Sequence, residues 1–216
     1  NGGGDSADTC LKVSQLSKKT GYPIQAIHIP KTVDNDLPIT DNCPGFGSVA
    51  KYIAVSTREA SFDVASMAKT STKVFILEVM GRHAGWIALH SGMASSAACV
   101  LIPEVKFSLD KVCAYVNSCF DKGQAPIIVI AEGAIPQDGD MVIKDQTLDA
   151  FGHVKLSGIG EWLAQAVEAK TGHESRTVVL GHVQRGGTPS AFDRVLATRF
   201  GLMAITAASE GDWGKM

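Results

Sequence analysis

The segment Pro30-Lys31-Thr32-Val33-Asp34-Asn35-Asp36 constrains this chain more than any other stretch. It follows the apolar run 24–29, which we expect to be a buried β-strand. Open α/β sheets bind their ligands at the carboxyl ends of strands, so this polar cluster is a candidate ligand site. A lysine can neutralise phosphate oxygens, and a carboxylate can accept a hydroxyl proton or hold a metal ion. The segment therefore suits phosphoryl transfer, although a solvated polar loop accounts for it equally well when it is taken alone.

Strand-like apolar runs alternate with helix-like segments along the whole chain. The pattern predicts strands at 24–29, 74–79, 98–102, 126–130 and 176–180, helices at 6–20, 47–69, 83–94, 109–122, 159–170 and 190–209, and a polar loop or hairpin at 136–145. Short continuous apolar runs are typical of parallel strands that are buried on both faces. The alternation favours a doubly wound α/β fold with a mainly parallel sheet and helices on both faces.

Composition narrows the classes of partner. The 216 residues carry a formal net charge of −2, so no basic surface predicts binding to nucleic acid or to a membrane. Every apolar stretch is far shorter than the roughly 18 residues that a membrane-spanning helix needs. The five cysteines are an odd number at irregular spacings, which favours a reduced, cytoplasmic protein.

Three more polar, glycine-containing clusters follow predicted strands. They are Met80-Gly81-Arg82-His83, Ala131-Glu132-Gly133 and the segment 181–187, which reads Gly-His-Val-Gln-Arg-Gly-Gly. Glycine lets backbone amides approach a ligand closely, and arginine grips phosphate oxygens with its guanidinium group. Each cluster alone has an ordinary structural explanation, but four of them on one edge of a sheet favour a site for a phosphate ester.

The chain begins with Asn1 and a run of glycines ahead of a predicted helix. The turn Gly2-Gly3-Gly4-Asp5-Ser6 suits a phosphate, with Ser6 as the N-cap of a helix that starts near Ala7. Asp5 would repel a phosphate unless a metal or a lysine such as Lys31 intervenes. No serine lies in a Gly-x-Ser-x-Gly motif and no cysteine–histidine spacing predicts a zinc site, so any metal is expected to be magnesium.

Together, the segment 30–36, Met80-Gly81-Arg82, Glu132 and the segment 181–187 resemble the phosphofructokinase family, in its order along the chain. The details are similar to the diphosphate-dependent branch of that family. Members that use ATP have glycine at the position of Lys31 and Gly-Gly-Asp-Gly-Ser where this chain reads Gly2-Gly3-Gly4-Asp5-Ser6. Asp5 would crowd and repel the α-phosphate of a nucleotide, while Lys31 adds a cation for diphosphate.

The resemblance implies a role for each matching residue. Asp34 would be the base that deprotonates the 1-hydroxyl of fructose 6-phosphate, supported by Asp36, with charge stabilisation from Lys31 and Arg82. The remaining positions implied by the family are Thr32, Met80, Gly81 and Glu132 for the sugar, His182 and Arg185 for its 6-phosphate, Arg176 and Lys73 as residues that reach a neighbouring subunit, and Gly3, Gly4, Asp5 and Ser6 for the donor. The implied cofactor is Mg²⁺, and the implied assembly is a homodimer or homotetramer.

Two departures from the family pattern leave alternatives open. Gly4 stands where the family usually has an acidic or amide residue near the metal, so the metal ligands stay unassigned. The family's earlier strand and phosphate loop are also missing, so residues 1–216 are expected to be a central portion that spans parts of two Rossmann-like lobes. The leading expectation is reversible transfer from diphosphate to fructose 6-phosphate. The alternatives are an ATP-dependent 6-phosphofructokinase and a non-catalytic protein that binds sugar phosphates.

Overall fold

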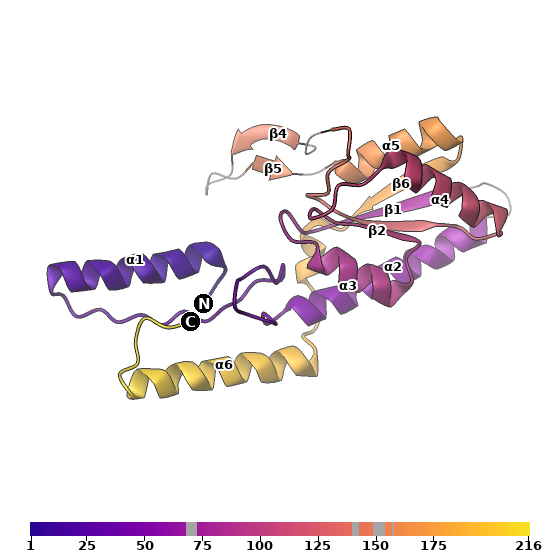
Figure 1. Ribbon diagram of the computed structural model, residues 1–216. Coiled ribbons are helices and arrows are strands. Elements are labelled where there is room, and N and C mark those ends of the chain that lie inside the picture. The colour runs from indigo at the N-terminus through magenta and orange to yellow at the C-terminus, as the bar shows by residue number, and fades with distance from the viewer. Residues whose placement is uncertain (68–72, 140–142, 149–153, 157) are drawn as a thin grey trace. The chain divides into compact units, whose positions relative to one another are not determined.

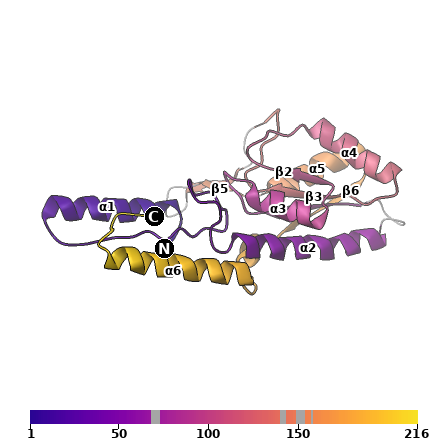
Figure 2. The same cartoon turned by 60° about the horizontal axis from the view of Figure 1, so that its bottom comes forward.

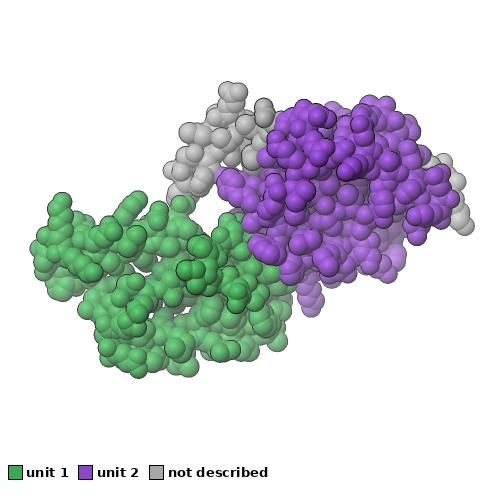
Figure 3. All heavy atoms as spheres, viewed as in Figure 1, with its two compact units in different colours: residues 1–48, 188–216 green, residues 49–187 purple. Residues whose placement is uncertain are grey.

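The computed structural model describes residues 1–67, 73–139, 143–148, 154–156 and 158–216. The chain divides into two compact units, the first formed by residues 1–48 with 188–216 and the second by residues 49–187 (Figure 3). Among the described residues, no helix is long and apolar enough to cross a bilayer.

The second unit is built on a four-stranded parallel sheet. Its strands, in the spatial order β2-β3-β1-β6, are β2 Cys99–Leu101, β3 Ile127–Ala131, β1 Lys73–Val79 and β6 Glu174–Val179. All three pairings are parallel, which confirms the predicted fold class. Parallel pairing also brings the carboxyl ends of the four strands to the same edge.

Helices cover both faces of this sheet, as Figures 1 and 2 show. The helices of the second unit are α2 Phe46–Met67, which begins in the first unit, α3 Trp86–Ser95, α4 Leu109–Asp121 and α5 Ile159–Thr171. On one face, Ile76 and Ile128 pack with residues of α4 and α5, and on the other, Phe75 and Ile127 pack with Val64 of α2. Successive residues of a strand point to opposite faces, so strands covered on both sides must be apolar throughout.

A short antiparallel pair lies outside the main sheet. It consists of β4 Ile143–Leu148 and β5 Val154–Leu156. Part of this pair falls within the loop or hairpin predicted for 136–145, of which residues 140–142 lie outside the described residues.

The first unit holds two long helices, α1 Gly4–Thr20 and α6 Ala191–Ser209, with irregular chain between them (Figure 1). The segment 22–30 runs beside the last residues of the chain, where the N–H of His28 bonds to the carbonyl of Lys215 at 3.0 Å and the N–H of Gly214 to the carbonyl of Ala26 at 2.9 Å. None of the residues of α1 is buried within the described structure.

The predicted strand at 24–29 is wrong. This segment is irregular up to Pro30, which forms one isolated parallel bridge to Gly2. A strand needs a ladder of backbone hydrogen bonds to a neighbour, and α1 begins two residues after Gly2, so pairing on that side stops there. An apolar run alone indicates burial, but it does not show whether a neighbouring strand is present to pair with it.

All six predicted helices are found: those at 109 and 159 begin as predicted, and the other four begin one to three residues from the predicted start. The first begins at Gly4 with Gly3 as its N-cap, so Ser6 lies inside the first turn and is not the cap that we expected. The third begins at Trp86 rather than His83, with Gly85 as its N-cap residue. Residues 68 and 69, at the predicted end of the second helix, lie outside the described residues.

Candidate phosphate-ester site

Three of the four polar clusters meet at the carboxyl edge of the parallel sheet. Met80-Gly81-Arg82 follows β1, Glu132-Gly133 follows β3, and the segment 181–187 follows β6. These strands are neighbours in the order β3-β1-β6, so the three clusters are adjacent. The fourth cluster, 30–36, belongs to the other unit and follows no strand, so the prediction that four strand ends converge is correct for three of them.

Glycines allow the ends of β1 and β3 to lie against each other. The N–H of Gly133 donates to the carbonyl of Gly81 at 3.1 Å, and a Cβ on Gly133 would lie 1.9 Å from the carbonyl oxygen of Arg82. At Gly81, φ is +136° and a Cβ would lie 2.7 Å from the carbonyl oxygen of Ala84. No other residue fits either place without moving the backbone, so both glycines are structurally required at this edge.

The end of β6 is fastened to the end of β1 by a buried side chain. Gln184, in the short 3₁₀ helix η1 Gly181–Arg185, is only 1% exposed. Its Oε1 accepts a hydrogen bond from the N–H of Met80 at 3.0 Å, and its Nε2 donates to the carbonyl of Gly181 at 3.0 Å. Nothing in the sequence marks Gln184 as structural, since only burial distinguishes a structural amide from a surface one.

The charged groups of this edge remain open to solvent. His182 and Arg185 are exposed, and Arg82 and Glu132 are half-buried. The N–H of Glu132 donates to the carbonyl of Val79 at 2.9 Å, which fixes its backbone at the end of β3. Two guanidinium groups and a histidine on a glycine-rich edge suit an anionic ligand.

Lys73 and Arg176 lie toward the opposite edge of the sheet. Lys73 is the first residue of β1, about 20 Å from its carboxyl end at roughly 3.3 Å per residue. The carboxylate of Glu174 lies 3.5 Å from the ammonium of Lys73 and 2.8 Å from Nη2 of Arg176. Lys73 is buried against Met67 and Glu174, whereas Arg176 is exposed. Of the two, only Arg176 is open to solvent.

In the first unit, the bridge between Gly2 and Pro30 places Lys31 beside the start of α1. The N–H of Lys31 donates to the carbonyl of Gly2 at 2.9 Å, and the N–H of Gly2 donates to the carbonyl of Ile29 at 3.2 Å. The N-cap residue Gly3 has no side chain to satisfy the first N–H groups of the helix. Free N–H groups beside a lysine attract an anion. Gly3, Gly4, Asp5 and Ser6, predicted together, do lie together at this helix start.

The candidate base lies in the loop that leads from this bridge to α2. The N–H of Asp34 donates to the hydroxyl of Thr32 at 3.2 Å, and Asp34 is half-buried, while Asp36 is exposed. This local hydrogen bond turns the backbone between the two residues.

A second residue that the sequence did not single out, Asp193, anchors the end of that loop. It is 4% exposed and accepts hydrogen bonds from the N–H groups of Gly45 at 3.0 Å and Ser48 at 2.8 Å, and from the hydroxyls of Ser48 and Ser190. Burial raises the pKa of Asp193, but these hydrogen bonds together lower it by more than burial raises it. The pKa of Asp193 therefore lies below its usual value. The Asp193 carboxylate, on α6, thus accepts hydrogen bonds from backbone N–H groups at the amino end of α2.

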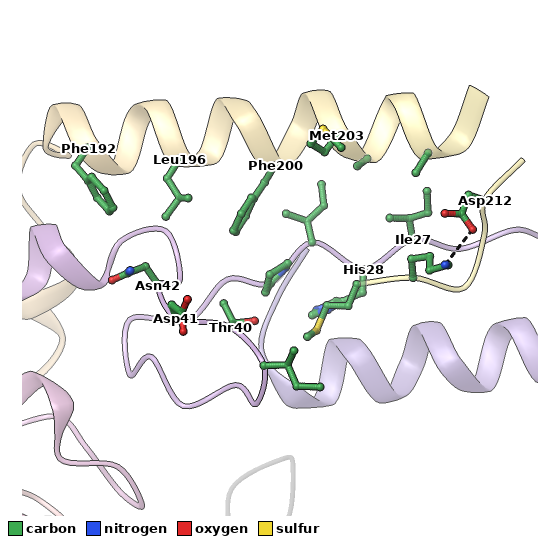
Figure 4. Close-up of a pocket in the computed structure, with 17 residues that line it drawn as sticks. Ile27, His28, Thr40, Asp41, Asn42, Phe192, Leu196, Phe200, Met203 and Asp212 are labelled. Carbon is green, nitrogen blue, oxygen red and sulfur yellow. Dashed lines mark ion pairs between the residues drawn. The ribbon is translucent and has the colours of Figure 1, made fainter. Parts of the chain in front are cut away.

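An apolar groove of about 700 Å³ lies elsewhere in the first unit (Figure 4). Phe192, Leu196, Phe200 and Met203 of α6 line one side of it. It contains none of the predicted catalytic or phosphate-binding residues, so its chemistry does not match a phosphate ester.

The described residues contain no group of three or more histidine, cysteine, aspartate or glutamate side chains that could hold a metal. Mg²⁺ is commonly held by one or two carboxylates together with substrate phosphates and water. The exposed carboxylate of Asp36 is compatible with that kind of binding.

Comparisons with known proteins agree with this picture. The sequence model of the phosphofructokinase family, described as "Phosphofructokinase", matches residues 1–208. A Streptomyces coelicolor protein named pyrophosphate–fructose 6-phosphate 1-phosphotransferase is 54% identical over 97% of this chain and 59% of its own. A Corynebacterium efficiens protein named ATP-dependent 6-phosphofructokinase is 45% identical over 94% of this chain and 57% of its own.

The fold is similar to that of solved members of the same family. The crystal structure of a pyrophosphate-dependent phosphofructokinase from Nitrosospira multiformis has a TM-score of 0.84 and 52% identity, covering 98% of this chain and 51% of that one. The chain spans between about half and three fifths of the length of these relatives.

Proposed function

The chain belongs to the phosphofructokinase family, and on that premise we propose that it transfers a phosphoryl group from diphosphate to the 1-hydroxyl of fructose 6-phosphate, reversibly. The product would be fructose 1,6-bisphosphate, a step of glycolysis. The single observation that carries the choice of donor is the backbone pairing that sets Lys31 beside Gly2, two residues before Gly4 and three before Asp5. The two residues that distinguish the donors thus occur at one helix start.

The proposed chemistry is an in-line attack. Asp34 takes the proton of the 1-hydroxyl, the oxygen attacks the terminal phosphorus of diphosphate, and phosphate leaves. Lys31 and Arg82 offset the negative charge that develops, because transfer of a phosphoryl group depends mainly on positioning and charge stabilisation. Asp36 supports Asp34 or the charge of the transition state.

The acceptor is proposed to bind through the residues that the sequence singled out. Thr32, Met80, Gly81 and Glu132 would hold the sugar, and His182 and Arg185 its 6-phosphate. The exposed positions of His182 and Arg185, at the carboxyl edge of the sheet, support this assignment.

The cofactor is proposed to be Mg²⁺. It would be carried chiefly by the oxygens of diphosphate, with the carboxylate of Asp36 as the protein's contribution, since Asp34 serves as the base. When bound, it neutralises charge on the transferring phosphoryl group.

We place the protein in the cytoplasm as a homodimer or homotetramer. All five cysteines are free, which agrees with a reducing compartment. The exposed guanidinium of Arg176 supports a contact from a neighbouring subunit, whereas the buried Lys73 offers less support.

The test is a coupled assay of the purified protein with fructose 6-phosphate and either magnesium diphosphate or magnesium ATP. We expect turnover with diphosphate and little with ATP. Turnover with ATP alone would select the ATP-dependent alternative, which the Corynebacterium relative favours. Calorimetric binding of fructose 6-phosphate without turnover of either donor would select a non-catalytic binding protein.

A further inference from the structure

Asn35 separates the two carboxylates of the 30–36 segment and has a left-handed backbone. Its φ is +55°, while its neighbours Asp34 and Asp36 are not among the residues with positive φ. Asparagine is enriched in this conformation because its short polar side chain bonds locally to the backbone. The sharp turn at this residue sets how the chain carries one carboxylate relative to the other.

Both ends of the Asn35 amide bond to the far side of the loop. Its Oδ1 accepts a hydrogen bond from the N–H of Cys43 at 2.7 Å, and its Nδ2 donates to the carbonyl of Asp41 at 3.0 Å. Cys43 is 0% exposed, so the first of these bonds is made at the edge of a packed region. The amide thereby closes the loop 35–43 across eight residues.

The same loop is fixed at its two ends by other contacts. Before it, Pro30 is bridged to Gly2, and after it, Gly45 donates to the buried carboxylate of Asp193. Between these anchors, both ends of the Asn35 amide form hydrogen bonds that join the Asp34 side of the loop to its return. Without the Asn35 amide, the loop would keep the contacts at its two ends but lose these two hydrogen bonds across it.

We propose that Asn35 is a positioning residue for Asp34: its amide holds the loop 35–43 in the shape that presents the base. The catalytic part of this inference rests on the proposed function, but the structural part does not. Misplacing a catalytic group by about 1 Å can lower a rate by about 100-fold, so loss of these two hydrogen bonds should affect kcat much more than sugar binding.

The test compares Asn35→Gly with the matched control Asn42→Gly. Glycine keeps the left-handed backbone freely available, so Asn35→Gly removes only the amide. Asn42 is exposed in the same loop, and its replacement measures the effect of an added glycine. For each protein, hydrogen exchange of the peptide covering 36–45 and the steady-state constants with magnesium diphosphate are measured. Exchange of peptides from β1 and β3 checks that the fold is kept.

For Asn35→Gly we expect exchange of the 36–45 peptide to accelerate about tenfold, kcat to fall about 100-fold, and KM for fructose 6-phosphate to change less than about threefold. For Asn42→Gly we expect values near those of the unsubstituted protein. Equal exchange in the two variants would overturn the proposal, and so would faster exchange with unchanged kcat. If the unsubstituted protein turns over no donor, the proposed function fails, while the exchange result still decides whether Asn35 holds the loop.

Discussion

The side-chain amide of Gln184 accepts a hydrogen bond from the backbone N–H of Met80 at 3.0 Å, so one buried group joins the carboxyl ends of β6 and β1. Its other end donates to the carbonyl of Gly181 at 3.0 Å. Met80 and Gly81, which we assign to the sugar, and His182 and Arg185, which we assign to its 6-phosphate, are therefore joined by contacts within one unit. The same edge owes its close packing to Gly81 and Gly133, which leave no room for a side chain.

Gln184→Met should lower the free energy of unfolding by about 2 kcal/mol. Methionine has a similar size, but it leaves the N–H of Met80 and the carbonyl of Gly181 without their buried partner, and each such loss costs about 1–3 kcal/mol. Urea unfolding measures the change. Gln165→Met is the matched control, because Gln165 is exposed and its side chain bonds to Glu161 within the same helix α5. Equal stability of the two variants would contradict the structural role of Gln184.

Replacement of the proposed base gives a catalytic prediction. Asp34→Ser should lower kcat by two to four orders of magnitude, since general base catalysis contributes about 10²–10⁴-fold. Binding of fructose 6-phosphate should persist, because the other sugar and phosphate contacts are untouched. Steady-state kinetics and calorimetry measure the two effects separately. A variant with full turnover would show that Asp34 is not the base.

The proposed role of Lys31 at the phosphoryl donor gives a second kinetic prediction. Lys31→Gly should raise KM for diphosphate or lower kcat about tenfold or more, since an ion-paired cation at a phosphate is worth about 1.5–3 kcal/mol. The constants for fructose 6-phosphate should change little. Lys215→Ala is the control, because it removes an exposed cation of the same unit without adding a glycine to the backbone. Lys12→Gly is not used, because a glycine at Lys12 would weaken helix α1. Equal losses in both variants would point to general charge rather than to a donor site.

The sequence was sufficient for the parallel sheet and its helices because their apolar periodicity is set by burial on both faces. It failed at 24–29, where the run is partly buried but has no ladder partner, as the single bridge of Pro30 shows. Strand pairing depends on residues that are distant in the chain, and the local periodicity of apolar residues contains no information about them.

The sequence predicts those parts of the candidate site that depend on residue type. It does not predict the parts that depend on where a residue lies in the folded structure. Arg82, Glu132 and Arg185 were found because charged residues next to glycine follow strands. Gln184 and Asp193 were missed, since an amide or a carboxylate near a helix start is common, and only burial and partners mark these two as structural anchors.

Acid should weaken the anchor that Asp193 provides. Its pKa is lower in the folded protein than the ordinary 3.8, so its hydrogen bonds contribute stability above that ordinary value, and the contribution is lost as pH falls through the folded pKa. Asp193→Asn should therefore lower the free energy of unfolding by about 2 kcal/mol near neutral pH, with the difference shrinking below about pH 4. Unfolding curves of both proteins between pH 3 and about 7 measure this. A difference that stays constant with pH would mean that ionisation of Asp193 does not contribute.

Ile39 offers a stabilising change in the same unit. It has a φ of +65° and is fully exposed at 102%, although a β-branched side chain in the left-handed region is strained. Ile39→Asn should raise the free energy of unfolding by about 1 kcal/mol, because asparagine tolerates this conformation and no buried contact is lost. Ile24→Asn is the control, since Ile24 is 44% exposed and is not among the residues with positive φ. Stabilisation in both variants would trace the gain to polarity, and stabilisation in neither would mean that the left-handed backbone at Ile39 costs nothing.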